Sequence, residues 1–128
     1  MRTREDVEAY LLRSGRPYEE VGEETWLVRD PATGENVVVR LSGPLVVVRV
    51  KVMPLSALKR RAEALEKLLE LNASELVHVS YGVAGDAVVL TATLRLETLD
   101  YEELQSVLDE MSLAVTQHHA TLAAFRDA

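Results

Sequence analysis

A two-faced strand that runs directly into a capped helix, over residues 86–125, is the feature that most constrains this fold. Apolar and polar side chains alternate before the helix begins. One face of the strand carries Val88, Leu90, Ala92, Leu94 and Leu96, and the other carries Val89, Thr91, Thr93, Arg95 and Glu97. A period of two in a segment rich in Val, Thr and Leu predicts a half-buried strand.

The helix that follows has its own start signal. Asp100 is a suitable N-cap, and Glu103 stands three residues later, as in a capping box. Leu99 and Leu104 occupy the positions of a hydrophobic staple. An apolar stripe then alternates spacings of four and three and predicts one continuous helix of about seven turns. The stripe comprises Leu104, Leu108, Met111, Val115, His118, Leu122 and Phe125.

A helix of this length exceeds the width of a small sheet. We therefore expect its last turns, with His118, Leu122 and Phe125, to contact a second subunit in a homodimer. The rest of the stripe is sufficiently explained by packing, so we do not expect a functional site there.

Composition bounds the class of protein. The 128 residues predict a single domain over 1–128, and 48% hydrophobic with 27% charged residues is typical of a globular chain. The absence of cysteine excludes disulfides, thiolate nucleophiles and cysteine zinc sites. Without a leader or a long apolar run, we expect a cytoplasmic protein that binds no membrane. A net charge of −7 also argues against nucleic-acid partners.

The order of the remaining elements indicates the fold class. Thr3 is a suitable cap for a first helix that ends at Gly15. Strands are predicted over 18–21, 25–29, 35–41, 45–53 and 76–81, with a hairpin loop over 82–86. This arrangement predicts an α+β fold of order α-β(3-4)-α-β(2)-α, an antiparallel sheet with helices mainly on one face.

A second helix is predicted over 56–71. Ser56 is its expected N-cap and Asn72 its expected C-cap. Its buried face is predicted to carry Leu58, Ala62, Leu65 and Leu69, widened by Leu68.

No catalytic, metal or cofactor motif stands out. His78, His118 and His119 show neither of the spacings typical of histidine metal sites, so no metal ligands and no cofactor are predicted. His118 lies within the helix stripe, where a core or interface histidine is the better interpretation. Adjacent acidic residues point in different directions on a strand or helix and are interpreted as solvated surface. We therefore expect no enzymatic activity.

One distribution on the predicted sheet is less ordinary. Its inward residues are Trp26, Val28, Val46, Val48, Val50 and Val52, and its outward residues are Leu27, Arg29, Leu45, Val47, Arg49, Lys51 and Met53, joined by Val38, Arg40 and Arg95. Two interpretations stay open. The cations either solubilise an exposed sheet face or, with their Val and Leu neighbours, form a protein-binding surface. The lack of aromatic residues argues against an RNA-stacking sheet.

Three segments carry a resemblance to a known family. Residues 68–72, the glycine hairpin with the strand 88–94, and residues 99–104 resemble YbjN-type domains of the type III secretion chaperone-like superfamily. The meander at 45–50 is similar too. The resemblance implies an α–β(3)–α–β(2)–α fold that is often dimeric and has no enzymatic activity. The strand predicted at 18–21 departs from that minimal pattern.

The expected function is therefore non-catalytic protein binding. A dimeric chaperone-like or regulatory domain would hold an extended segment of a partner, with Leu45, Val47, Arg49 and Lys51 as the predicted contacts. A regulatory domain that senses a small ligand is the alternative, and it would need an apolar pocket with convergent polar groups.

Overall fold

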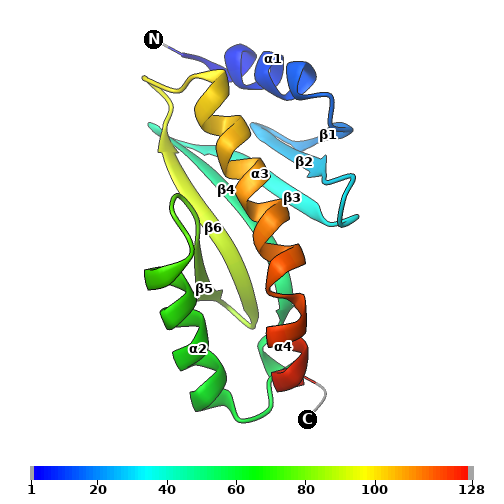
Figure 1. Ribbon diagram of the computed structural model, residues 1–128. Coiled ribbons are helices and arrows are strands. Elements are labelled where there is room, and N and C mark those ends of the chain that lie inside the picture. Colours follow the sequence, from blue (N-terminus) through cyan, green and yellow to red (C-terminus); the bar gives the residue numbers. More distant parts are fainter. Residues whose placement is uncertain (1, 127–128) are drawn as a thin grey trace.

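The computed structural model describes residues 2–126 and contains one antiparallel sheet with helices on one of its faces (Figure 1). In chain order the elements are α1 (Arg4–Ser14), β1 (Tyr18–Gly22), β2 (Thr25–Arg29), β3 (Asn36–Ser42), β4 (Leu45–Pro54), the short 3₁₀ turn η1 (Leu55–Ala57), α2 (Arg61–Ser74), β5 (Ser80–Ala84), β6 (Ala87–Arg95), α3 (Tyr101–Gln117) and α4 (His119–Arg126). The predicted fold class is confirmed.

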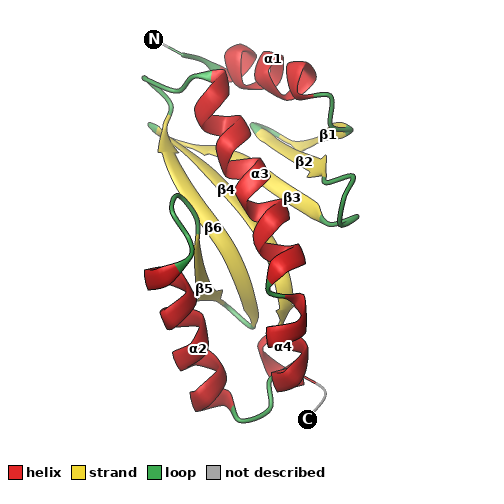
Figure 2. Ribbon diagram, in the orientation of Figure 1, coloured by secondary structure: helices red, strands yellow, loops and turns green. Residues whose placement is uncertain are grey.

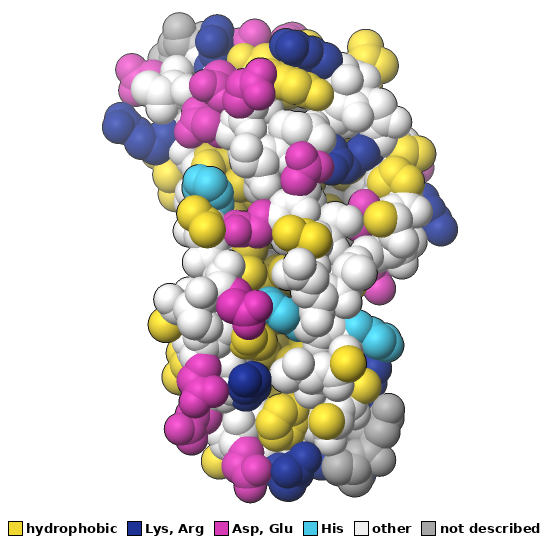
Figure 3. Space-filling view, in the orientation of Figure 1, with side chains coloured by type: hydrophobic (Ala, Val, Ile, Leu, Met, Phe, Trp, Pro, Cys, Tyr) yellow, Lys and Arg dark blue, Asp and Glu magenta, His cyan; other side chains and the backbone are white. Residues whose placement is uncertain are grey.

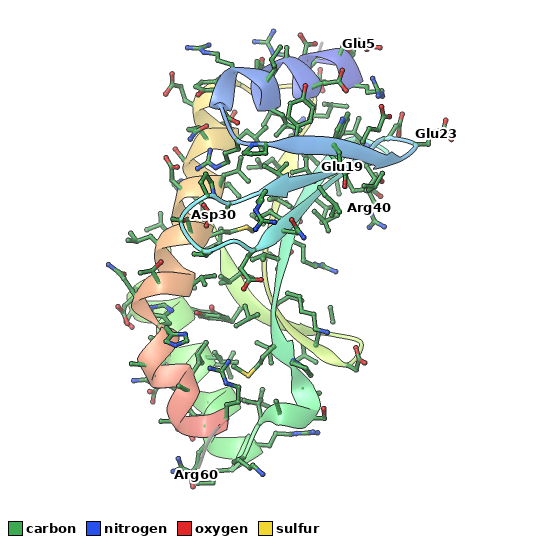
Figure 4. All side chains as sticks on the ribbon, turned by 90° about the vertical axis from the view of Figure 1, so that its right-hand side faces the viewer. Glu5, Glu19, Glu23, Asp30, Arg40 and Arg60 are labelled. Atoms are coloured by element: carbon green, nitrogen blue, oxygen red, sulfur yellow. The ribbon has the colours of Figure 1, made fainter. Side chains whose placement is uncertain are left out.

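Six strands form the sheet in the order β1-β2-β3-β4-β6-β5, with every neighbouring pair antiparallel. Helix α3 runs diagonally across one face, with α1 at one end and with α2 and α4 at the other (Figure 2). The opposite face carries no helix (Figure 4). The molecule therefore has an inner sheet face that lies against helices and an outer face that does not.

The capping predictions hold at both well-defined helix starts. The Asp100 carboxylate accepts from the Glu103 backbone N–H at 2.8 Å, and the Glu103 carboxylate accepts from the Asp100 N–H at 3.2 Å. Thr3 and Asp6 form the equivalent box at α1. Gly15 ends α1 with φ of 76°, a left-handed conformation that glycine adopts without a Cβ penalty.

The predicted alternation of β4 is confirmed as far as Lys51 and fails beyond it. Val46, Val48 and Val50 are buried on the inner face. A β-bulge then shifts the register, since Lys51 pairs with Val89 and Met53 pairs with Val88. The extra residue reverses the pattern, so that Met53 is buried and Val52 is only partly buried. The prediction that Met53 points outward is therefore wrong.

Helix α2 differs from its prediction in both its start and its buried face. Residues 55–57 form the 3₁₀ turn and α2 begins only at Arg61, so Ser56 is not its N-cap. The buried residues of the helix are Ala64, Leu68 and Leu71, whereas Leu69 is 67% exposed. The buried face was predicted by counting helical spacings from Leu58. Because Leu58 precedes the helix, that count selected the wrong face.

Strand β5 begins four residues later than predicted, because a side chain replaces its first ladder bonds. The Glu110 carboxylate of α3 accepts the backbone N–H groups of Val77, His78 and Val79 at 2.9, 2.7 and 2.8 Å. The segment before Ser80 is therefore held by a helix side chain instead of by a neighbouring strand. The hairpin to β6 is correspondingly tighter, with Ala84 paired to Ala87.

The long C-terminal helix is interrupted at His118. Helices α3 and α4 replace the single helix that the stripe predicted, and His118 has φ of −93° and ψ of 1° between them. Its ring reaches β5, where Nδ1 lies 2.7 Å from the Tyr81 hydroxyl. Leu122 of α4 is buried in the same core as the inner sheet face.

Candidate functional site

The outer face of the sheet contains a shallow basic and apolar depression, which we call the outer-sheet patch. It has a volume of about 230 Å³ and is lined by Val38, Arg40, Val47, Arg49, Lys51 and Val89. These residues come from β3, β4 and β6, the central strands of the sheet. The patch therefore lies on the most extensively paired part of the fold.

Strand register fixes how these side chains alternate. Val38 of β3 pairs with Arg49 of β4, whereas Arg40 pairs with Val47. On the other side of β4, Lys51 pairs with Val89. Each cation thus has a valine opposite it on the next strand, and neighbouring strands lie about 4.8 Å apart. The patch is an alternating surface of charge and apolar side chains, not a charged cluster beside a separate apolar one.

The three cations of the patch are exposed and have no acidic partner within residues 2–126. Among these three cations of the described chain, only Arg49 makes a side-chain hydrogen bond, from Nε to the Thr91 hydroxyl at 3.3 Å. Figure 4 shows Arg40 directed away from the helices. Glu19 shares this face, but it lies on β1 opposite Leu27, two strands beyond Val38. The charges on the patch are therefore free to meet a partner.

All four residues that the sequence predicted for partner binding lie on this face. Val47, Arg49 and Lys51 line the depression. Leu45 lies beyond its rim, pairs with Arg95 and is 37% exposed. Sequence reasoning did not single out Val89, whose side chain is 5% exposed although it belongs to the outer face. The alternating pattern of β6 already placed Val89 on the same face as Thr91 and Thr93, and this placement could have identified it as an outer-face residue.

The three predicted dimer contacts lie on the helix-bearing side, at the junction of α3 with α4 and within α4. His118 and Leu122 are buried within the chain, with exposures of 4% and 5%. Phe125 is partly buried, and the Arg60 guanidinium lies 5.0 Å from its ring centroid. Packing within the chain thus accounts for His118 and Leu122, and a contact of these residues with a second subunit stays a prediction.

A second apolar surface was missed because of the misassigned α2 face. Leu65, Leu69 and Val83 line a depression of about 240 Å³ between α2 and β5. Leu69 and Val83 are 67% and 51% exposed. This surface carries no charge on its lining residues, which distinguishes it from the outer-sheet patch.

A cleft of about 560 Å³ lies between the end of α1, the β2–β3 loop and α3. Arg16 pairs with Asp109 at 2.6 Å there, while Arg16 Nη1 and Gln105 Oε1 are buried without a protein partner. Its lining includes Ser14 and Ser112 but no histidine that could act as a base. The arrangement is not a nucleophile–base constellation.

Among residues 2–126, no cluster of three or more His, Asp or Glu side chains could hold a metal ion. In that same part of the chain, no helix is long and apolar enough to cross a membrane. The helix-bearing face carries acidic side chains together with Lys and Arg side chains (Figure 3).

Comparison with known proteins gives a family and a fold. The model of the CesT_Tir_1 family matches residues 1–128. No curated protein matches the sequence. One chain of the heterodimeric ExoU–SpcU complex from the type III secretion system of Pseudomonas aeruginosa superposes with a TM-score of 0.68 and 20% identity, covering 87% of this chain and 93% of that chain.

Two further solved structures share the fold. A chain of the ExsC–ExsE complex has a TM-score of 0.70 and 17% identity, covering 95% of this chain and 97% of its own length. YbjN from E. coli has a TM-score of 0.66 and 12% identity, covering 93% and 92%. The resemblance to YbjN-type and secretion-chaperone domains is therefore confirmed at the level of the fold.

Proposed function

This chain belongs to the CesT_Tir_1 family of type III secretion chaperones, and on that basis we propose that it is a non-catalytic, chaperone-like protein that holds an extended segment of a partner protein. Two of the structurally similar proteins were solved in complex with another protein. From these two proteins we carry over only the general mode of binding, which is passive capture of a polypeptide. A cytoplasmic location remains part of the proposal.

The observation that carries this proposal is the free outer face of the sheet. Apolar side chains at Val38 and Val47 are accessible there between unpaired cations, on strands that cannot move independently because each is paired on both sides. A rigid, partly apolar surface loses little conformational entropy when it binds a flexible segment, so less of the binding free energy is spent on ordering. The segment supplies extended side chains, and the patch supplies preference among them.

Charge reversal on the patch tests the proposal. Peptides selected on the wild-type protein from a display library should bind the double variant Arg49→Glu, Lys51→Glu at least about tenfold more weakly, the effect of turning two attractions into repulsions. The matched control is Lys59→Glu, Arg61→Glu, which reverses two exposed cations near the start of α2. Both variants should melt cooperatively near the wild-type temperature, which establishes that they fold.

Unchanged binding to the Arg49→Glu, Lys51→Glu variant would overturn the assignment of the site. Equal loss in both double variants would show that net charge, not the outer-sheet patch, governs capture.

We further propose that the protein acts as a homodimer. Of the three predicted dimer contacts, Phe125 is the one whose side chain is only partly buried, so we assign the contact to it. Sedimentation equilibrium of Phe125→Ser should then give a monomer at concentrations where the wild type is a dimer. Leu69→Glu on the α2–β5 surface is the comparison variant. A monomer produced by Leu69→Glu and not by Phe125→Ser would place the dimer contact at α2 and β5 instead.

A further inference from the structure

The outer-sheet patch is basic in a chain whose formal net charge is −7. Random placement of 14 basic and 21 acidic residues would favour acids on any surface of this size. The three charged residues that line this depression are nevertheless all cations, Arg40, Arg49 and Lys51. Acidic side chains are visible on the helix-bearing face, among Lys and Arg side chains (Figure 3). The charge of the patch thus opposes that of the whole chain.

The cations are also unusually accessible to a ligand. Arg16, by comparison, is tied to Asp109, and Arg95 lies 3.8 Å from Glu97. Arg40, Arg49 and Lys51 have no carboxylate within ion-pair distance among residues 2–126. A binding carboxylate would therefore displace no internal carboxylate, and the hydrogen bond from Arg49 Nε to the Thr91 hydroxyl leaves the other guanidinium N–H groups available.

The spacing of the cations suits an extended chain. Arg49 and Lys51 are two residues apart on one strand, so their Cα atoms are about 6.7 Å apart along β4. An extended segment that runs parallel or antiparallel to β4 presents side chains toward the sheet at the same interval. Val47 continues the row on the same strand, and Val38 and Val89 flank it on β3 and β6.

We propose that the segment held by the outer-sheet patch is acidic, with Asp or Glu side chains directed at Arg49 and Lys51 and Val- or Leu-type side chains directed at Val38, Val47 and Val89. The inference rests on the proposed function and adds the chemistry of the partner. Arginine binds a carboxylate through two parallel N–H donors, so Arg49 and Arg40 favour carboxylates by geometry as well as charge.

The apolar floor distinguishes an acidic peptide from a nucleic acid. Val89 is 5% exposed at the base of the depression, and Val38 and Val47 are partly buried beside it. The lining contains no aromatic residue on which a base could stack. A sugar–phosphate backbone would use the cations and leave the three valines without apolar partners.

Three short peptides of equal length test the proposal on the full chain. The first has Val, Glu and Glu at every second position with Ser between them, so that these three side chains face the sheet together when the peptide is extended. The second has Gln in place of every Glu, and the third has Lys at those positions. We expect the Glu peptide to bind about tenfold more tightly than the Gln peptide, as for two partly exposed ion pairs, and the Lys peptide to bind least. The preference should diminish as salt is raised.

Two variants assign the effect to the patch. Arg49→Gln, Lys51→Gln should bind the Glu and Gln peptides equally, whereas Val47→Ser should weaken both by the same factor and keep their ratio. Equal affinity of the wild type for the Glu and Gln peptides, with both lost in Val47→Ser, would overturn the acidic-segment inference and leave the proposed function standing. Peptide binding that none of these variants changes would overturn the proposed function itself.

Single-stranded RNA and inorganic polyphosphate serve as the remaining probes. Weak binding of both relative to the Glu peptide is the expected result. Binding of either as tight as that of the Glu peptide, and insensitive to Val47→Ser, would overturn the inference, because it would identify a general polyanion surface.

Discussion

Glu110 shows how one side chain can replace several ladder bonds of a sheet. Its carboxylate accepts three consecutive backbone N–H groups, from residues 77–79, and so attaches the start of β5 to α3. Burial by itself would raise the pKa of this carboxyl, but the three N–H donors and the nearby His78 outweigh burial and hold the pKa of Glu110 below its usual value.

Replacing Glu110 by Gln should lower the free energy of unfolding by about 2 kcal/mol. The amide has only one oxygen to accept from three backbone N–H groups, and its NH₂ group is itself a donor that would face a backbone N–H. Denaturant unfolding at neutral pH measures this difference. Glu66→Gln, an exposed substitution on α2, is the control and should stay within about 0.5 kcal/mol of wild type. A Glu110→Gln protein as stable as the control would contradict this role.

The lowered pKa of Glu110 also predicts a pH dependence. The pKa of this carboxyl in the folded protein lies below its value in the unfolded chain, which is about 4.3. Its contribution to the stability of the folded protein is therefore complete above about pH 4.3 and is lost as the pH falls through the folded-state pKa. The difference in stability between wild type and Glu110→Gln should therefore shrink progressively below about pH 4. A difference that is constant down to pH 2 would contradict the assignment.

His118 is a buried polar residue whose bonds explain its position in an apolar stripe. Nε2 faces the Glu75 carboxylate at 3.8 Å, which favours the ring proton there and leaves Nδ1 to accept from the Tyr81 hydroxyl at 2.7 Å. Burial, and secondarily the Glu75 charge, raise the pKa of Tyr81, so this hydroxyl keeps its proton and donates.

Tyr81→Phe should therefore cost about 1–2 kcal/mol of stability, since it leaves a buried imidazole nitrogen without its donor. Thermal unfolding at neutral pH measures the loss. Tyr101→Phe is the matched control, because the Tyr101 ring packs against Tyr10 and Arg13 while its hydroxyl makes no hydrogen bond within residues 2–126. Equal melting temperatures for the two variants would show that the Tyr81–His118 bond contributes nothing net.

At the scale of elements, β5 is an edge strand that is partly blocked. Asn72 of α2 acts like a short neighbouring strand, because its Oδ1 accepts the Tyr81 backbone N–H at 2.7 Å and its Nδ2 donates to the Tyr81 carbonyl at 3.1 Å. Open strand edges invite pairing with other chains, and a side chain that occupies the backbone groups prevents it.

Asn72→Leu should expose the Tyr81 backbone groups, lower stability by about 1–3 kcal/mol and increase self-association. Light scattering at increasing concentration, alongside denaturant unfolding, measures both effects. Asn72→Asp isolates the donor, since it keeps Oδ1 for the Tyr81 N–H and loses the bond to the carbonyl. An Asn72→Leu protein with wild-type stability and association would contradict the edge-blocking role.

The elements that the sequence predicts well are those specified by neighbouring residues. The Asp100–Glu103 box, the Thr3 cap and the inward valines of β4 depend on local spacing, and all are observed. The misplaced features depend on partners distant in sequence. The bulge before Met53 is set by pairing with β6, and the break at His118 accompanies a bond to β5. No periodicity within a single segment contains that information.

The start of β5 illustrates the same limit. Residues 76–81 alternate well enough to predict a strand, yet the N–H groups of residues 77–79 are taken by Glu110 from a helix more than thirty residues away. Likewise, the exposed Leu69 was placed inside because the helix was started too early. The candidate site was more predictable, because alternation along β3 and β4 determines which side chains share the outer face.

On the scale of the whole molecule, the packed core and the proposed binding surface lie on opposite faces of one sheet. The inner face and the helices form the apolar core, while the outer face keeps a patch of cations and valines accessible on the most firmly paired strands. What the sequence could not indicate was that these cations lack acidic partners within the described chain, since that depends on where every carboxylate lies after folding.

The most direct test of acidic-segment binding at the outer-sheet patch is chemical-shift mapping of backbone amides in isotopically labelled protein during titration with the Glu peptide. We expect the largest perturbations to cluster on the outer-sheet patch, at Val38, Arg40, Val47, Arg49 and Lys51, with little change in α2. Perturbations confined to Leu65, Leu69 and Val83, or to the cleft beside Arg16, with the patch unchanged, would contradict it.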